Sequence, residues 1–134
     1  MNRIEHIGIA VGDLESAMQT FERLLGTPPY KKETVESEGV KTVFFKVGEI
    51  KIELLEATKA DSPIAKFIDK RGQGIHHIAF DVDSVEEKAA ELRANDFVVL
   101  NESPKAGADN KMISFIHPKS TNGVLVELCQ EKDK

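Results

Sequence analysis

Ile4-Glu5-His6-Ile7-Gly8-Ile9-Ala10-Val11 returns 71 residues later as Ile75-His76-His77-Ile78-Ala79-Phe80-Asp81-Val82. Both stretches alternate in the manner of a half-buried strand, and a helical pattern follows each of them. The first helix is predicted from an N-cap at Asp13 to Gly26, and the second begins with the capping box Ser84 to Glu87. The chain therefore contains an internal repeat.

Strands are expected after each helix. Residues 40–47 and 50–55 flank the turn at Gly48-Glu49, and residues 111–116 and 123–129 flank a longer loop at 117–122. The acidic stretch that contains Glu33, Glu36 and Glu38 is expected to be a solvated loop. We expect one α+β domain over residues 1–134, with a first module at about 1–60, a linker helix at about 61–73 and a second module at about 74–130.

Strand alternation selects one histidine and one glutamate in each half. His6 points away from the apolar residues of its strand, and His77, not His76, is its equivalent. Glu53 and Glu127 likewise point away from the apolar faces of the last strands. If the halves pair about a pseudo-twofold axis, these two imidazoles and two carboxylates converge, and such a set suits a divalent cation. Taken singly, each of them is more often an ordinary structural or solvated residue.

Composition excludes several classes of function. The net charge of −5 argues against nucleic acid as a partner, since phosphate binding needs a basic face. No apolar run is long enough to span a bilayer, and the N-terminus lacks the pattern of a signal peptide. Cys129 is the only cysteine, which rules out an internal disulfide and fits a reducing compartment. We expect a cytoplasmic protein without a membrane partner.

The sequence resembles the vicinal-oxygen-chelate superfamily and, within it, the methylmalonyl-CoA epimerase family. The resemblance covers nearly the whole chain. It is carried by the His6 and His77 strands and by four further motifs: Ile52-Glu53-Leu54-Leu55, Asp61-Ser62-Pro63-Ile64-Ala65-Lys66-Phe67, His117-Pro118-Lys119 and Gly123-Val124-Leu125-Val126-Glu127-Leu128. It implies two tandem βαβββ modules that form a cupped, eight-stranded mixed sheet around a metal. It also implies inversion at C2 of methylmalonyl-CoA, between the (2R) and (2S) forms.

The resemblance implies His6, Glu53, His77 and Glu127 as ligands of one divalent ion, such as Co, Zn, Ni, Mn or Mg. Glu127 is the catalytic candidate. Some family members carry a second glutamate where this chain has Thr42, and a hydroxyl is a poor base at neutral pH. Thr42, His76, Lys111 and Lys119 are the candidate substrate contacts, although strand parity favours packing for His76 and solvated surface is the default for either lysine.

Three functions stay open at this point. The first is an epimerase that acts on an acyl-CoA thioester. The second is a glyoxalase-type isomerase, which acts on a thiol adduct of a 2-oxoaldehyde. The third is a metal-free module that sequesters a small molecule. A homodimer is expected because exposed sheet edges in small duplicated modules often pair.

Overall fold

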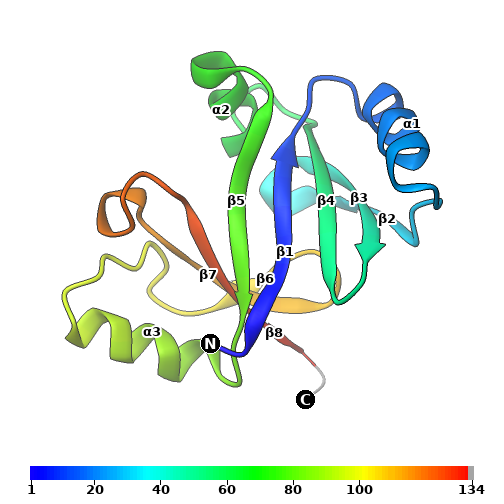
Figure 1. Cartoon of the computed structure of the whole chain (residues 1–134). Coiled ribbons are helices and arrows are strands. Elements are labelled where there is room, and N and C mark those ends of the chain that lie inside the picture. The colour runs from blue at the N-terminus through cyan, green and yellow to red at the C-terminus, as the bar shows by residue number, and fades with distance from the viewer. Residues whose placement is uncertain (133–134) are drawn as a thin grey trace. The chain divides into compact units, whose positions relative to one another are not determined.

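The computed structural model describes residues 1–132 and separates into two compact units. One unit comprises residues 6–76, and the other comprises residues 1–5 together with residues 77 onward. The strand β1 (Arg3–Ala10) therefore begins in one unit and ends in the other, as does β5 (Gly74–Asp81) (Figure 1).

The unit of residues 6–76 contains most of β1, two helices and three further strands. In chain order these are α1 (Leu14–Leu25), β2 (Lys31–Val35), β3 (Val40–Val47), β4 (Ile50–Ala57) and α2 (Pro63–Arg71). The strand order is β2-β3-β4-β1, with β1 parallel to β4 and antiparallel pairing elsewhere. Short 3-10 turn Glu36–Glu38 joins β2 to β3.

The other unit repeats this plan. After β5 it contains α3 (Val85–Ala94), β6 (Lys105–Ala106), β7 (Lys111–Ile116) and β8 (Val126–Glu131). The strand order is β5-β8-β7-β6, and β5 is parallel to β8 as β1 is to β4. Two tandem βαβββ modules are therefore confirmed, and with them the α+β class.

The predicted helix ends are confirmed by their capping hydrogen bonds. The Asp13 side chain accepts from the backbone N–H of Ser16 at 3.2 Å, and Gly26 takes the left-handed conformation that ends α1. The Ser84 hydroxyl accepts from the N–H of Glu87 at 3.1 Å. Helix α2 starts after Ser62, with Pro63 in its first turn. These polar ends fix where each helix meets its sheet.

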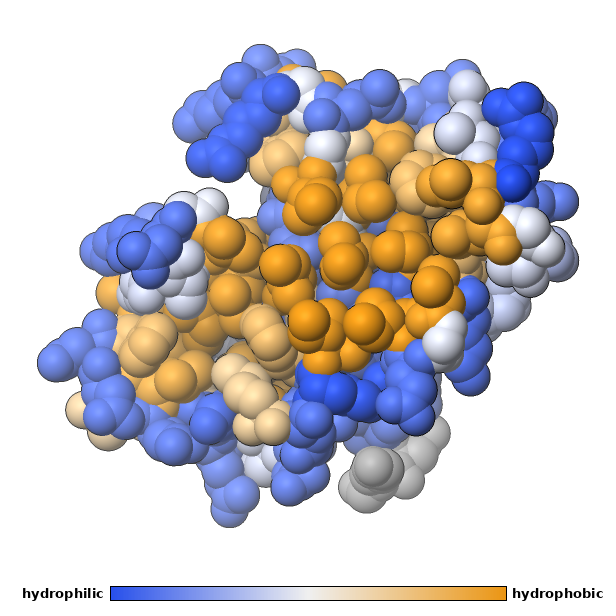
Figure 2. Space-filling view, viewed as in Figure 1, coloured by the Kyte–Doolittle hydropathy of each residue, from blue (hydrophilic) through white to orange (hydrophobic). Residues whose placement is uncertain are grey.

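Apolar side chains on one face of β1, β3 and β4 pack against α1. Val11, Val43, Phe45 and Leu54 are buried there, and α1 adds Leu14, Ala17, Met18, Phe21 and Leu25. Figure 2 shows hydrophobic side chains gathered over β1 and β4, beside the hydrophilic outer surface of α1. In the other unit Val82, Ile116 and Leu128 pack with Val85 and Ala89 of α3. Helices α1 and α3 thus cover the predicted apolar strand faces. Helix α2 instead packs on Ala10, Val40 and Leu55, which share the opposite face with His6 and Glu53.

Two predictions about where strands lie in the sequence are wrong. Glu33 lies in β2 instead of a loop, and Glu36 and Glu38 form the 3-10 turn, because strand β2 pairs with β3 over its full length. The last strand begins at Val126, not Gly123, because residues 121–125 are held in a turn: the Thr121 hydroxyl donates to the carbonyl of Val124. No helix within residues 1–132 is long and apolar enough to cross a bilayer.

Candidate metal and substrate site

Each unit holds one buried pair of a histidine and a glutamate. In the unit of residues 6–76, Nε2 of His6 lies 3.3 Å from Oε1 of Glu53. In the other unit, Nε2 of His77 lies 3.4 Å from Oε1 of Glu127. All four side chains are at most 7% exposed. Charged or polar side chains that are buried this deeply need a partner, and within each pair the histidine and the glutamate serve as partners for each other.

The local fold explains how each pair forms. The first strand of each unit is parallel to the last, which places Gly8 beside Glu53 and Ala79 beside Glu127. Each histidine lies two residues before that position, and because strand side chains alternate, it shares the face of the glutamate. A glycine and an alanine at the paired position leave room for the imidazole and the carboxylate to approach.

A phenylalanine completes each pair. Phe44 is the cross-strand partner of Glu53, and its ring meets the His6 ring edge to face at 6.4 Å between centroids. Phe115 is the partner of Glu127 and meets His77 in the same way at 6.1 Å. The two phenylalanines hold the imidazole rings in a fixed orientation. Sequence reasoning missed them, although they are separated by the same 71 residues as the two histidines.

The chemistry of each pair fits a divalent metal ion. Two ligands about 2.1 Å from one ion lie about 3.0 Å apart at a right angle and about 3.4 Å apart at the tetrahedral angle. The observed separations of 3.3 and 3.4 Å fall in this range. Imidazole nitrogen and carboxylate oxygen are ligands that Zn, Co, Ni and Mn accept. Each unit thus offers two groups that can hold such an ion.

Thr42 lies on the same face as His6 and Glu53. It lies two residues before Phe44, at the neighbouring same-face position of β3, and pairs with Leu55 of β4. Its side chain is buried, and within residues 1–132 its hydroxyl oxygen has no hydrogen-bond partner. A buried hydroxyl without a partner is costly, so Thr42 marks a place where a ligand could supply one.

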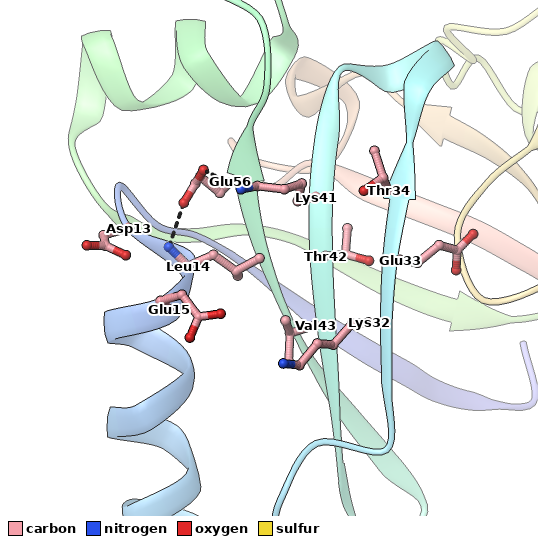
Figure 3. Close-up of a pocket in the computed structure, with 10 residues that line it drawn as sticks. All are labelled: Asp13, Leu14, Glu15, Lys32, Glu33, Thr34, Lys41, Thr42, Val43 and Glu56. Carbon is pink, nitrogen blue, oxygen red and sulfur yellow. Dashed lines mark hydrogen bonds and ion pairs between the residues drawn. The ribbon is translucent and has the colours of Figure 1, made fainter.

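A pocket of about 390 Å³ is lined by residues at the start of α1 and on β2, β3 and β4, Thr42 among them (Figure 3). Figure 3 shows Val43 and Lys32 directed toward α1, whereas Thr42 and Glu33 point away from it. Glu56 accepts from the backbone N–H of Leu14 at 2.6 Å and pairs with Lys41 at 3.4 Å. Lys41 and Glu56 are thus engaged with each other, and Thr42 of the His6 face also lines this pocket.

The other predicted substrate contacts differ in their exposure and in their partners. His76 is half-buried, with its ring edge-on to Phe67 at 5.0 Å. Lys119 is exposed in the short turn Pro118–Ser120. Lys111 is buried, where its ammonium group pairs with Glu131 and lies 3.9 Å from Glu5. An ammonium group already held by two carboxylates is poorly available to a phosphate, whereas His76 and Lys119 stay accessible.

Cys129 lies on the Glu127 face of β8 and is fully buried. Burial, together with the neighbouring carboxylates of Glu127 and Glu5, raises the pKa of the thiol far above its ordinary value. Its Sγ lies 3.5 Å from the carbonyl of Phe80, to which it can donate. The raised pKa favours the neutral thiol over the nucleophilic thiolate.

Comparison with known proteins assigns the chain to a family. Residues 5–115 match the glyoxalase/bleomycin resistance protein/dioxygenase superfamily. The human mitochondrial methylmalonyl-CoA epimerase is 39% identical over 97% of this chain and 74% of its own length. The chain belongs to the methylmalonyl-CoA epimerase family of this superfamily.

Two further relatives support this membership over the full length. An uncharacterised Bacillus subtilis protein, YqjC, is 45% identical over 98% of this chain and 94% of its own length. A Streptomyces coelicolor methylmalonyl-CoA epimerase, solved in complex with 2-nitronate-propionyl-CoA, superposes with a TM-score of 0.94 at 36% identity and covers 98% of each chain. The resemblance inferred from the sequence motifs is confirmed.

Proposed function

We propose that this protein is a methylmalonyl-CoA epimerase, which interconverts the (2R) and (2S) forms by moving the proton at C2. The observation that supports this proposal most directly is the buried His–Glu pair, which occurs once in each module. The fold that holds the two pairs is shared with solved epimerases. Membership of that family supplies the reaction and the acyl-CoA substrate. The remaining steps follow from what the side chains can do.

We further propose that His6, Glu53, His77 and Glu127 together hold one divalent ion. The support is the equivalence of the two pairs by repeat position, their burial, and separations that suit ligands of one ion. When bound by these residues, such an ion would act as a Lewis acid toward the negative charge that develops as C2 loses its proton. Its identity among Co, Zn, Ni, Mn and Mg is left to measurement.

Glu127 is the residue that we assign to remove and return the proton. A carboxylate has two oxygens, so one can face a cation while the other accepts a proton. Glu127 is buried beside Phe115, its cross-strand partner, and burial strengthens charge interactions. Return of the proton to the opposite face of C2 then falls to Glu53 or to a water molecule, since the Thr42 hydroxyl is too weakly basic.

The test follows exchange of the C2 proton of methylmalonyl-CoA in deuterated water by NMR. We expect exchange by the wild type, and loss of both exchange and bound metal in His6→Ala and in His77→Ala. Lys88→Ala, on α3, is the control and keeps both. Turnover of the methylglyoxal–thiol hemithioacetal without exchange would favour a glyoxalase-type isomerase and overturn the proposal. Metal content unchanged in both histidine variants would favour a metal-free binding module.

Location and assembly stay predictions. The single cysteine is free and buried, as expected for a reducing compartment such as the cytoplasm. We propose a homodimer because exposed sheet edges in small duplicated modules often pair. Sedimentation at two protein concentrations tests this proposal.

A further inference from the structure

Thr42 and Glu33 are direct neighbours on two strands of the unit of residues 6–76. Thr42 of β3 pairs with Glu33 of β2 in the antiparallel register, so both side chains leave the sheet on the same face. Figure 3 shows these two side chains directed the same way, away from α1. Side chains that lie opposite each other in this way have Cβ atoms about 4.5–5.5 Å apart. The register therefore brings a hydroxyl and a carboxylate together, and the carboxylate of Glu33 has no role in the function described above.

The strand pairing also places Thr42 next to the His6–Glu53 pair. On β4 the residue opposite Thr42 is Leu55, and Glu53 lies two residues before it, opposite Phe44. Residues two apart in a strand share a face, and such diagonal neighbours on adjacent strands lie about 7–8 Å apart. Thr42 is thus a diagonal neighbour of Glu53, on the face to which the His6–Glu53 pair points.

The Thr42 hydroxyl is buried without a hydrogen-bond partner among residues 1–132, and the residue is 1% exposed. Although Glu33 lies directly opposite, its carboxylate does not bond to this hydroxyl, so more than a hydrogen-bond length separates the two groups. A buried hydroxyl without a partner is costly. One water molecule can bridge two polar groups across such a gap, and the bridge is nearly as favourable as a direct hydrogen bond.

Lys31 fixes the direction of the Glu33 carboxylate. Its Nζ lies 3.5 Å from Oε1 of Glu33. Lys31 is opposite Phe44, and Phe44 is opposite Glu53, so this ion pair draws the carboxylate toward the end of the strands where Glu53 lies. The Glu33 side chain is 30% exposed, which lets its carboxylate exchange protons with bulk water. An oriented carboxylate that reaches solvent is suited to receive a proton and to release it between turnovers.

We propose that, in the substrate complex, Thr42 and Glu33 hold a water molecule that is the second proton carrier at C2, an inference that rests on the proposed function. The Thr42 hydroxyl donates to the water oxygen, and the water donates to the Glu33 carboxylate. When the C2–H bond breaks on this side, its proton forms an O–H bond with the water, and another proton of the water passes to Glu33. The bonding electrons stay on the substrate. The reverse transfer returns a proton to C2, and the water is unchanged after either one.

The test follows inversion and isotope exchange separately for the two stereoisomers. Each pure isomer of methylmalonyl-CoA is incubated with the metal-loaded protein in deuterated water, and both inversion and deuterium at C2 are recorded. One isomer loses its proton to Glu127 and the other loses it to the water. In Glu33→Gln we expect inversion of both isomers to fall roughly 10²-fold, while the isomer that Glu127 deprotonates still exchanges its C2 proton within about threefold of the wild-type rate. A purely structural defect would lower exchange of both isomers alike.

Two further variants of glutamate serve as controls. Glu36→Gln removes the same charge from an exposed residue nearby, and because exposed charges are screened, both rates should stay within about twofold of the wild type. Glu33→Asp keeps a carboxylate and should recover inversion to within about tenfold of the wild type. Bound metal and Tm are measured in each variant, and neither should change in Glu33→Gln.

Thr42→Val removes the other contact of the water at nearly constant shape. We expect inversion to fall roughly tenfold, the effect of one lost hydrogen bond, while one isomer again keeps its exchange. A crystal structure of the wild type with methylmalonyl-CoA should place a water within about 3.2 Å of the Thr42 hydroxyl and of a Glu33 carboxylate oxygen.

The outcomes separate this inference from the proposed function. Inversion by Glu33→Gln at the wild-type rate, or equal losses of inversion and exchange on both isomers, would overturn the water site and leave the epimerase standing. A substrate atom bonded directly to the Thr42 hydroxyl in the crystal structure would do the same. A wild-type protein that neither inverts nor exchanges either isomer would refute the epimerase, and this inference with it.

Discussion

The two modules carry the same residue types at the His–Glu pairs. They carry different residues at the neighbouring positions of the same strands. His6, Phe44 and Glu53 of the first module correspond to His77, Phe115 and Glu127 of the second, with nearly equal separations. Beyond them the correspondence ends, since the repeat matches Val40 with Lys111, Thr42 with Ile113 and Leu55 with Cys129. The His–Glu pairs are thus duplicated, while their surroundings differ between the modules. The second module buries charge where the first has apolar side chains.

The largest expected effect tests whether the two glutamates share one role. Glu127→Gln keeps a side-chain oxygen for a cation but loses the proton acceptor, so kcat/KM for C2 exchange should fall about 10²–10⁴-fold. Glu53→Gln makes the same change in the other module, and we expect a smaller loss because a metal ligand can be an amide. Metal content is measured in parallel. Equal losses in the two variants would assign the second proton transfer to Glu53, whereas a larger loss in Glu53→Gln than in Glu127→Gln would overturn the assignment of Glu127 as the main acid–base residue.

Next in size is the cost of breaking the buried charge cluster of the second module. Lys111 and Glu5 are both nearly inaccessible, so Lys111→Met leaves the Glu5 carboxylate buried without its cation. Removal of one partner from such a pair destabilises a protein by about 3–5 kcal/mol, which chemical denaturation measures. Glu5→Gln/Lys111→Met should recover much of the loss.

A surface pair provides the comparison for that value. Lys88 and Glu91 form an ion pair of 3.1 Å on α3, and Glu91 is largely exposed. Lys88→Met should therefore change the free energy of unfolding by less than about 0.5 kcal/mol. If Lys111→Met proved as mild as Lys88→Met, the cluster would not be what distinguishes the second module.

The sequence predicted the duplicated part of the molecule better than the specialised part. Strand alternation and the repeat together placed four residues on the correct strand faces: His6, Glu53, His77 and Glu127. Both signals can be read from the sequence, because alternation needs only one strand and the repeat needs only the comparison of two segments. Lys111 was expected at the surface, because the residues around it in the sequence do not indicate that it would be buried beside Glu5, which is more than a hundred residues away. Strand β2 was missed because acidic residues have low strand propensity, and pairing with β3 overrides that preference.

A smaller effect concerns Cys129 and the pH dependence of stability. Burial raises the pKa of this thiol in the folded state, so at alkaline pH the unfolded chain releases a proton that the folded chain keeps. Stability should then fall as pH rises above the ordinary thiol pKa of about 8.5, by up to about 1.4 kcal/mol per pH unit from this residue. Cys129→Ala should flatten that part of the decline, relative to wild type, in denaturation measured at pH 8, 9 and 10.

The corresponding residue of the first module, Leu55, cannot titrate, so Leu55→Val should lower stability equally at all three pH values. A decline in Cys129→Ala as steep as that of the wild type would assign the alkaline loss to other groups.

Thr42 supplies the smallest effect and separates binding from folding. Its buried hydroxyl finds no partner within residues 1–132, whereas the matching position of the second module is the apolar Ile113. Thr42→Val removes that unpaired group at nearly constant shape and should stabilise the free protein by up to about 1 kcal/mol, while the exposed Thr34→Val changes less than about 0.5 kcal/mol. If substrate supplies the missing hydrogen bond, the same Thr42→Val variant should have a higher KM for methylmalonyl-CoA. A Thr42→Val variant that is less stable and has unchanged kinetics would mean that the hydroxyl serves the fold. The difference between Thr42 and Ile113 would then reflect packing alone.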